Sequence, residues 1–223
     1  MNKSKLLVGL CAGMFLFTHP LRAQGIRLFV TGSGSFLENE RFFQHLGDQF
    51  RSSYAKGGKI TLGGEFTPWK IAGLEAAYSY GVNNLRLADL SQAGSPLTGY
   101  GMRFQRLSAN LVGHSPVSLL GLRPYATAGL EYARVAPTSE AKTIAVTQGF
   151  AGQPQIISTS NKVGFNYGGG VDWSVIPLLG LRLDLRDHVT GSPTYGLSAN
   201  NFPISGAAHN VELSAGVVFH LGK

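Results

Sequence analysis

The segment Lys162-Val-Gly-Phe-Asn-Tyr-Gly-Gly-Gly-Val-Asp-Trp-Ser174 alternates between two kinds of side chain along its whole length. Its odd-numbered positions carry valine, phenylalanine, tyrosine and tryptophan around one glycine. Its even-numbered positions carry only lysine, glycine, asparagine, aspartate and serine. Successive side chains of a β-strand point to opposite faces, so this period of two predicts a strand with one apolar and one polar face.

Seven other segments repeat this alternation, most clearly near the C-terminus, where Val211, Leu213 and Phe219 alternate with Glu212 and His220. These segments are 25–35, 58–66, 74–82, 101–112, 122–135, 181–186 and 210–221. With 162–174 they predict eight strands and an all-β chain.

Short and long connections alternate between the predicted strands. The short ones each contain a proline and lie near 67–72, 113–121 and 174–180. The long ones lie near 37–57, 83–100, 136–161 and 188–209. Short turns at one end and long loops at the other are typical of outer-membrane barrels, whose short turns face the periplasm. We therefore predict an eight-stranded antiparallel up-and-down transmembrane β-barrel.

The polar face is predicted to point into the barrel, because it carries small residues such as Ser79, Gly168 and Ser214 that suit a crowded interior. The apolar face places aromatic residues toward the strand ends, as the two interfaces of a membrane favour. One belt, at the short-turn end, consists of Trp69, Trp173 and Phe219. The other, toward the loop end, consists of Tyr80, Tyr100, Tyr132 and Phe165.

Residues 1–23 differ from the rest of the chain. A short positive segment precedes an apolar run over residues 6–17, and small Ala23 closes the segment. This order is typical of a signal peptide. We expect cleavage after Ala23, which removes the single cysteine, Cys11, and leaves 24–223 as one barrel domain.

Composition narrows the classes of function. Charged residues make up 14% of the chain, against about a quarter in soluble domains. After residues 1–23, the 16 basic and 12 acidic residues are scattered, which argues against nucleic acid as a partner. A mature chain without cysteine has neither thiol catalysis nor a zinc–thiolate site. We expect a monomer without cofactor or metal.

After residue 24 the chain resembles small outer-membrane β-barrels such as the OmpA transmembrane domain and OmpX. The resemblance rests on the eight strands, the three short turns and the terminal strand Val217-Val-Phe-His-Leu-Gly-Lys223. It implies the outer membrane of a Gram-negative-type cell envelope, contact with outer-membrane lipid, and help from periplasmic chaperones and the barrel-assembly machinery during biogenesis. It also implies an interior plugged by polar side chains.

The predicted inward face carries many charged residues. Buried charges need partners, so we expect an ion-pair network across the interior. Side chains nearly fill an eight-stranded barrel, which favours a plug over a pathway for protons or small solutes. The residues are Glu65, Glu75, Glu131, Asp172, Asp184 and Glu212, with Arg27, Lys59, Arg123, Arg182 and Arg186.

We predict a structural or surface-interaction role, through adhesion, partner binding or lipid binding, and no enzymatic activity. Two alternatives stay open: a narrow pore or hydrophobic-solute channel, and a lipid hydrolase at the rim. The hydrolase would use Asp187, His188, Ser192 and His209, near the loop end of the last two strands. However, alternation places Asp187 and His188 on opposite faces, and the chain has no Gly-x-Ser-x-Gly elbow.

Two long connections carry expectations of their own. In 136–161, the β-rich runs 142–147 and 155–159 predict a projecting hairpin with its tip at 149–154, whose exposed edge could accept a strand from an extracellular partner. Between residues 39 and 51, four apolar residues fall near one helical face. They predict either a short helix across the barrel mouth or a loop packed by its own aromatic side chains.

Two outward arginines near the loop end, Arg103 and Arg134, are candidates for contact with lipid phosphate. Matching Leu111 with Ala126 across the turn at 113–121 places the two arginines directly opposite each other. Like charges in that position are unfavourable unless an anion lies between them. The alternative is that each arginine reaches separately into the lipid headgroup region.

Overall fold

The computed structural model describes residues 25–36, 41–45, 48–54, 57–69, 71–89, 98–148, 154, 156–197 and 206–221. The predicted signal peptide lies outside these residues. The strands are β1 (Ile26–Phe36), β2 (Arg41–His45), β3 (Asp48–Tyr54), β4 (Gly57–Phe66), β5 (Ala72–Asp89), β6 (Thr98–His114), β7 (Leu122–Pro137), β8 (Ser160–Ile176), β9 (Leu179–Gly191) and β10 (Ala207–Leu221). One helix, α2 (Ser139–Thr147), follows β7.

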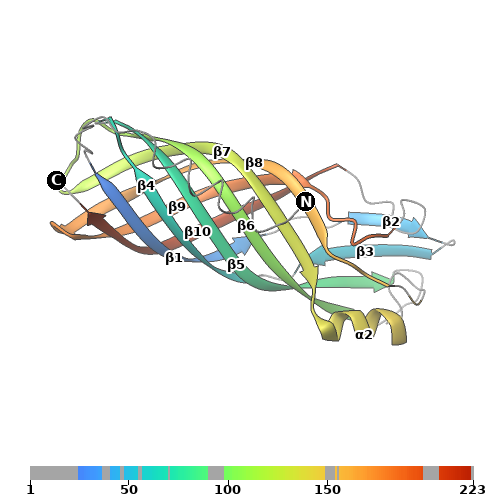
Figure 1. Cartoon of the computed structure of the whole chain (residues 1–223). Coiled ribbons are helices and arrows are strands. Elements are labelled where there is room, and N and C mark those ends of the chain that lie inside the picture. The colour runs from blue at the N-terminus through green and yellow to red at the C-terminus, as the bar shows by residue number, and fades with distance from the viewer. Residues whose placement is uncertain are drawn as a thin grey trace, which may run out of the picture.

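Eight of these strands form a closed barrel, as the sequence predicted (Figure 1). Every pair of neighbours is antiparallel, in the order β1, β4, β5, β6, β7, β8, β9 and β10. Pairing of β10 with β1, from Ile26↔Leu221 to Phe36↔Val211, closes the cylinder. Closure leaves the barrel without an unpaired edge.

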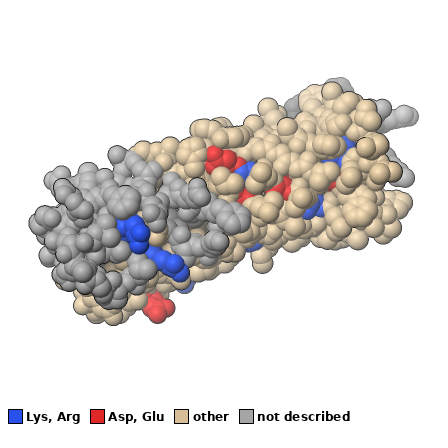
Figure 2. Space-filling model, turned by 180° about the vertical axis from the view of Figure 1, so that it is seen from behind, with Lys and Arg blue, Asp and Glu red and all other residues tan. Residues whose placement is uncertain are grey.

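The apolar face of the barrel points outward and the polar face points inward. Leu111 and Leu130 are each 69% exposed, whereas Glu65 is 1% exposed and Arg182 is 2% exposed. Uncharged residues accordingly dominate the described wall in the space-filling view (Figure 2). The predicted orientation of the two faces is therefore confirmed.

No helix in the described part of the chain is long and apolar enough to span a membrane.

At the loop end, β2 and β3 form a hairpin that continues the wall beyond the barrel (Figure 1). β3 pairs with the extended end of β5, from Phe50↔Asp89 to Tyr54↔Leu85. The predicted helix between residues 39 and 51 is therefore wrong. The extension of β5 past Val82 offers an open row of backbone hydrogen-bonding groups, which favours a strand over a helix. Residues 39, 40, 46 and 47 lie outside the described part.

The predicted hairpin in 136–161 is also wrong, because residues 139–147 form α2. The Thr138 side chain caps this helix by accepting a hydrogen bond from the Ala141 backbone N–H at 3.2 Å. Ala141 and Ala145, four residues apart on one face, are fully buried. Tertiary packing of this face thus outweighs the strand preference of the β-branched residues in α2. Of the predicted tip, 149–153 lies outside the described residues.

An apolar cluster at the loop end, which we call the loop-end core, joins α2 to the extended strands and to the segment after β9. Tyr100 belongs to this core and is 2% exposed, so it is not part of an outward aromatic belt as predicted. The reason is that the inward face of β6 is polar from Asn110 to Arg106 but apolar at Met102 and Tyr100, nearer the loop end. The core consists of Leu85, Leu87, Tyr100, Met102, Val135, Ala141, Ala145, Ile157 and Tyr195.

Candidate functional site: the charged interior of the barrel

Charged side chains from all eight barrel strands meet in the interior. Each strand presents alternate residues inward, so one or more charged positions per strand suffice to cross the lumen. One such residue per strand is Arg27, Glu65, Glu75, Arg106, Glu131, Asp172, Arg182 and Glu212, in the order of the barrel. All eight are at least 91% buried.

Small residues on the same face make room for these long side chains. Gly168 of β8 lies so close to β9 that an added Cβ would meet the carbonyl oxygen of Leu185 and the backbone of Arg186. The glycine therefore permits both the close approach of the strands and the inward course of Arg186.

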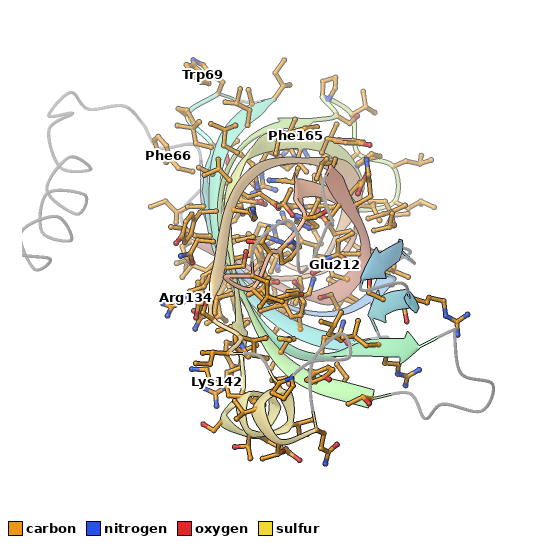
Figure 3. All side chains as sticks on the ribbon, turned by 90° about the vertical axis from the view of Figure 1, so that its right-hand side faces the viewer. Phe66, Trp69, Arg134, Lys142, Phe165 and Glu212 are labelled. Carbon is orange, nitrogen blue, oxygen red and sulfur yellow. The ribbon has the colours of Figure 1, made fainter. Side chains whose placement is uncertain are left out.

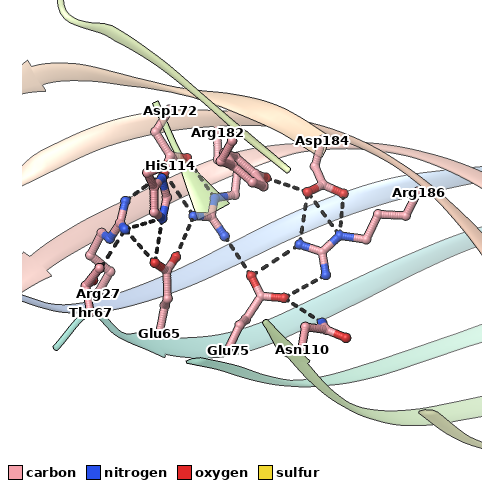
Figure 4. Close-up of polar contacts among 11 residues, drawn as sticks. Arg27, Glu65, Thr67, Glu75, Asn110, His114, Asp172, Arg182, Asp184 and Arg186 are labelled. Atoms are coloured by element: carbon pink, nitrogen blue, oxygen red, sulfur yellow. Dashed lines mark hydrogen bonds and ion pairs between the residues drawn. The ribbon is translucent and has the colours of Figure 1, made fainter. Parts of the chain in front are cut away.

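The ion pairs nearer the short-turn end form one connected group, the lower cluster (Figure 4). Arg27 contacts Glu65 at 2.5 Å and Asp172 at 3.0 Å. Arg186 contacts Glu75 at 2.6 Å and, at 2.8 Å, Asp184, which also accepts a hydrogen bond from Tyr125. The members are Arg27, Glu65, Glu75, Asp172, Arg182, Asp184 and Arg186.

Arg182 connects the two halves of the lower cluster. Its guanidinium group donates two hydrogen bonds to Asp172, at 2.8 and 3.0 Å, and reaches Glu65 at 3.3 Å and Glu75 at 3.2 Å. The same group lies over the Phe29 ring, with its central carbon 4.4 Å from the ring centroid. A planar guanidinium group combines ion pairing with stacking in a way that a lysine cannot.

A second group nearer the loop end, the upper cluster, consists of Lys59, Arg106, Glu131, His188 and Glu212. Glu212 contacts Lys59 at 2.6 Å and Arg106 at 3.1 Å, and it accepts a hydrogen bond from the Ser33 hydroxyl at 2.6 Å. Glu131 contacts the His188 ring at 2.6 Å and Arg106 at 3.5 Å.

Between the two clusters the interior has little free space. A cavity of about 30 Å³, lined by Arg186, His188 and Glu212 among others, separates them. A larger basin of about 370 Å³ opens at the short-turn end, below Arg27 and Asp172. The described interior is nearly neutral, because five cationic side chains in the two clusters face six anionic ones. Such an arrangement fills and crosslinks the barrel.

The structure brings the predicted interior residues together, and all of them are buried except Arg123. Arg123 is only half-buried at the short-turn end, where its Nε donates to the Ser115 carbonyl at 3.2 Å. Arg106 and His114 also lie inside the barrel and were not among the predicted interior residues, although both share the inward parity of Ser108 on their strand. Parity alone could have identified them. Their ion pairs with other strands depend on the barrel closure and register.

The predicted hydrolase residues do not converge. His188 is inside the barrel with Glu131, whereas Asp187 is on the outer face, 2.8 Å from the His209 ring and 3.0 Å from the Tyr167 hydroxyl. The Ser192 hydroxyl donates to the Gly206 carbonyl at 3.1 Å. These contacts give each of the four residues a structural role.

The predicted pairing of Arg103 with Arg134 is wrong by two residues. Arg103 lies opposite Ala136, and Arg134 lies opposite Gln105. The predicted register placed two residues too few between the paired positions, since Leu111 lies opposite Ala128 and not Ala126. The two arginines are therefore diagonal neighbours on the outer face, and direct opposition of like charges does not occur.

The remaining residues predicted for the aromatic belts lie on the outside of the wall, where Figure 3 shows Trp69 and Phe165. They are Trp69, Tyr80, Tyr132, Phe165, Trp173 and Phe219, with exposed fractions between 42% and 64%.

Two solved structures of outer-membrane proteins are similar to this chain. OprG from Pseudomonas aeruginosa aligns with a TM-score of 0.64 and 10% identity, over 91% of this chain and 98% of OprG. AlkL, solved in lipid bilayers, aligns with a TM-score of 0.52 and 12% identity, over 92% of this chain and 94% of AlkL. At such identities the likeness shows the fold alone. A comparison with curated protein sequences found no match.

A family model adds direct evidence from the sequence. The model of the outer membrane protein beta-barrel domain matches residues 22–219, which is most of the chain. The predicted resemblance and the predicted location in the outer membrane are thereby confirmed. The chain belongs to the outer membrane protein β-barrel domain family.

Proposed function

We propose that this protein is a closed, non-conducting barrel that holds a folded extracellular end at the cell surface, where it interacts with a partner. The observation that carries the proposal is the pair of ion-pair clusters, to which every barrel strand contributes. Between them, the cavity of about 30 Å³ has room for only about two water molecules.

The free energy needed to separate the buried ion pairs supports a closed interior. An ion crossing the lumen would have to displace Arg186 or Glu212, each of which contacts two oppositely charged side chains. Separating a buried charge from its partner costs several kcal/mol. The plug is therefore better supported than the narrow pore.

The close packing of the loop-end core favours a surface-interaction role and argues against a channel for hydrophobic solutes. Met102, Ala141 and Ala145 have no exposed surface, and Tyr195 is 1% exposed. Close packing of this kind fills the space that an apolar solute would occupy. A rim hydrolase has less support, since Ser192 lies apart from the Asp187–His209 pair.

The extracellular partner would meet the surface formed by the exposed side of α2 and by residues 156–159. Lys142 belongs to α2 (Figure 3), which lies at the loop end of the barrel (Figure 1). Val146 is 50% exposed and Ile156 is 84% exposed, although neither lies on the lipid-facing wall. Exposed apolar residues beyond the membrane are typical of protein interaction sites.

Swelling of proteoliposomes in small sugars tests the closed interior. We expect no swelling with the wild-type protein, and none with Ala145→Asp, which opens the loop-end core but leaves both ion-pair clusters in place. Swelling with both proteins would contradict the proposal. Swelling with Ala145→Asp alone would place the barrier in the loop-end core and would also contradict it.

A further inference from the structure

The outer wall of the barrel changes character at one level on neighbouring strands. On β6 the outward residues Leu111 and Leu107 are followed, toward the loop end, by Arg103. On β7 the outward Tyr132 is followed by Arg134. Apolar wall therefore gives way to exposed arginine on both strands.

This level coincides with the outer boundary of the membrane. Arg103 lies ten residues along β6 from Gly113, at the short-turn end. At a rise of about 3.3 Å per residue and a tilt of about 40°, ten residues climb about 25 Å, which is the height of the apolar band of such barrels. The Arg103 side chain thus starts where the lipid headgroups begin.

The register places the two guanidinium groups within reach of one ligand. Arg134 pairs with Gln105, and Arg103 is the next outward residue beyond Gln105 on β6. Diagonal neighbours of this kind are about 7–8 Å apart, which two arginine side chains can span. Neither arginine has an ion-pair partner in the part of the chain that the structure describes.

Among the described wall residues next to the two arginines on β5–β8, none is a carboxylate. On β5 the outward residue opposite Arg103 is Val82, followed toward the loop end by Asn84 and Arg86. On β8 the outward residue opposite Arg134 is Asn161. No outward position at this level of β5–β8 is acidic among the described residues. Figure 3 shows Arg134 on the outside of the wall, on the same side of the barrel as Lys142 of α2.

The other half of the wall differs. There, on β9 and β10, the outward polar residues near the loop end are Asp187 and His209, which pair with each other at 2.8 Å. In the described part of the wall, the side formed by β5–β8 is therefore cationic without acidic neighbours at this level, and on β9 and β10 Asp187 is matched by His209.

We infer that Arg103 and Arg134 form a binding site for the phosphate group of an outer-leaflet lipid. The planar fork of arginine binds phosphate oxygens in pairs, and two such forks neutralise one phosphate. The lipid is the source of the phosphate, because both arginines stand directly above lipid-facing side chains. The site is independent of the proposed closed interior and extends the function to lipid recognition.

Lipid binding by purified protein in a phosphate-free detergent tests this site. The probes are phosphorylated lipid A and the same lipid after removal of its phosphates. The variant is Arg103→Gln/Arg134→Gln, and the matched control is His209→Gln, on the other half of the wall. We expect the double variant to bind the phosphorylated lipid about tenfold more weakly or worse, and the control to bind it like wild type.

Three results would overturn the inference. The first is equal binding of phosphorylated lipid by wild type and the double variant. The second is equal binding of the two lipids by wild type. The third is displacement of the lipid by an equal concentration of inorganic phosphate, which would make the site one for the free ion. The two claims fail separately. A non-conducting barrel without selective lipid binding would contradict this inference alone, and a conducting barrel with selective lipid binding would contradict the proposed function alone.

Discussion

At the scale of single residues, buried partners decide the stability of the barrel. Glu212 contacts Lys59, Arg106 and the Ser33 hydroxyl, so Glu212→Ala removes the carboxylate that pairs with Lys59 and leaves Arg106 with Glu131 alone. We expect a loss of about 3–5 kcal/mol in the free energy of unfolding, measured by urea denaturation in lipid. Glu140→Ala, an exposed change of the same chemistry, should cost no more than about 1 kcal/mol. Equal urea midpoints for both variants would contradict the interior role of Glu212.

Glycines on the inward face are a second residue-scale determinant. A Cβ at Gly168 would press against the carbonyl oxygen of Leu185, whereas a Cβ at Gly113 would meet nothing within 4 Å. Gly168→Ala should therefore destabilise the barrel by about 1–3 kcal/mol, through strain between β8 and β9. Gly113→Ala should stay within about 0.5 kcal/mol of wild type in the same denaturation assay. The reverse order would show that strand spacing does not depend on Gly168.

At the scale of elements, α2 depends on its buried face. Ala145 has no exposed surface, whereas its neighbour Val146 is 50% exposed. Ala145→Asp should detach α2 from β6 and β7 by burying an unpaired carboxylate, and Val146→Asp should not. Protease treatment of intact cells measures this as faster cleavage within 139–148 for Ala145→Asp alone. Equal cleavage of both variants would show that the loop-end core does not hold the helix.

The strands of the barrel could be predicted from the sequence, but the loop end could not. Alternation survives in β8 because one face meets lipid and the other a polar interior, so two unlike environments mark the residues. α2 lacks such a signal: its β-branched residues favour a strand, and only packing of Ala141 and Ala145 against distant strands selects the helix. The pairing register of β6 with β7 could not be predicted from the sequence either. The position of Arg134 opposite Gln105 depends on how far β6 and β7 extend into their turn.

At the scale of the whole molecule, the barrel is a wall crosslinked through its own interior. Arg182 links β9 to β4, β5 and β8, and Glu212 links β10 to β4 and β6. Contacts across the lumen join strands that are not neighbours in the sheet. The barrel should therefore resist both conduction and distortion, and leave interaction to its extracellular end and its cationic side.

Single-channel recording in planar bilayers tests the closed interior most directly. The positive control is Glu75→Ala/Arg186→Ala, which removes an opposite pair, keeps the net charge and widens the lumen beside the cavity between the clusters. The account predicts no steady current through the wild-type protein and measurable openings in the double variant. Steady ohmic conductance of the wild-type protein, unchanged in the double variant, would contradict it.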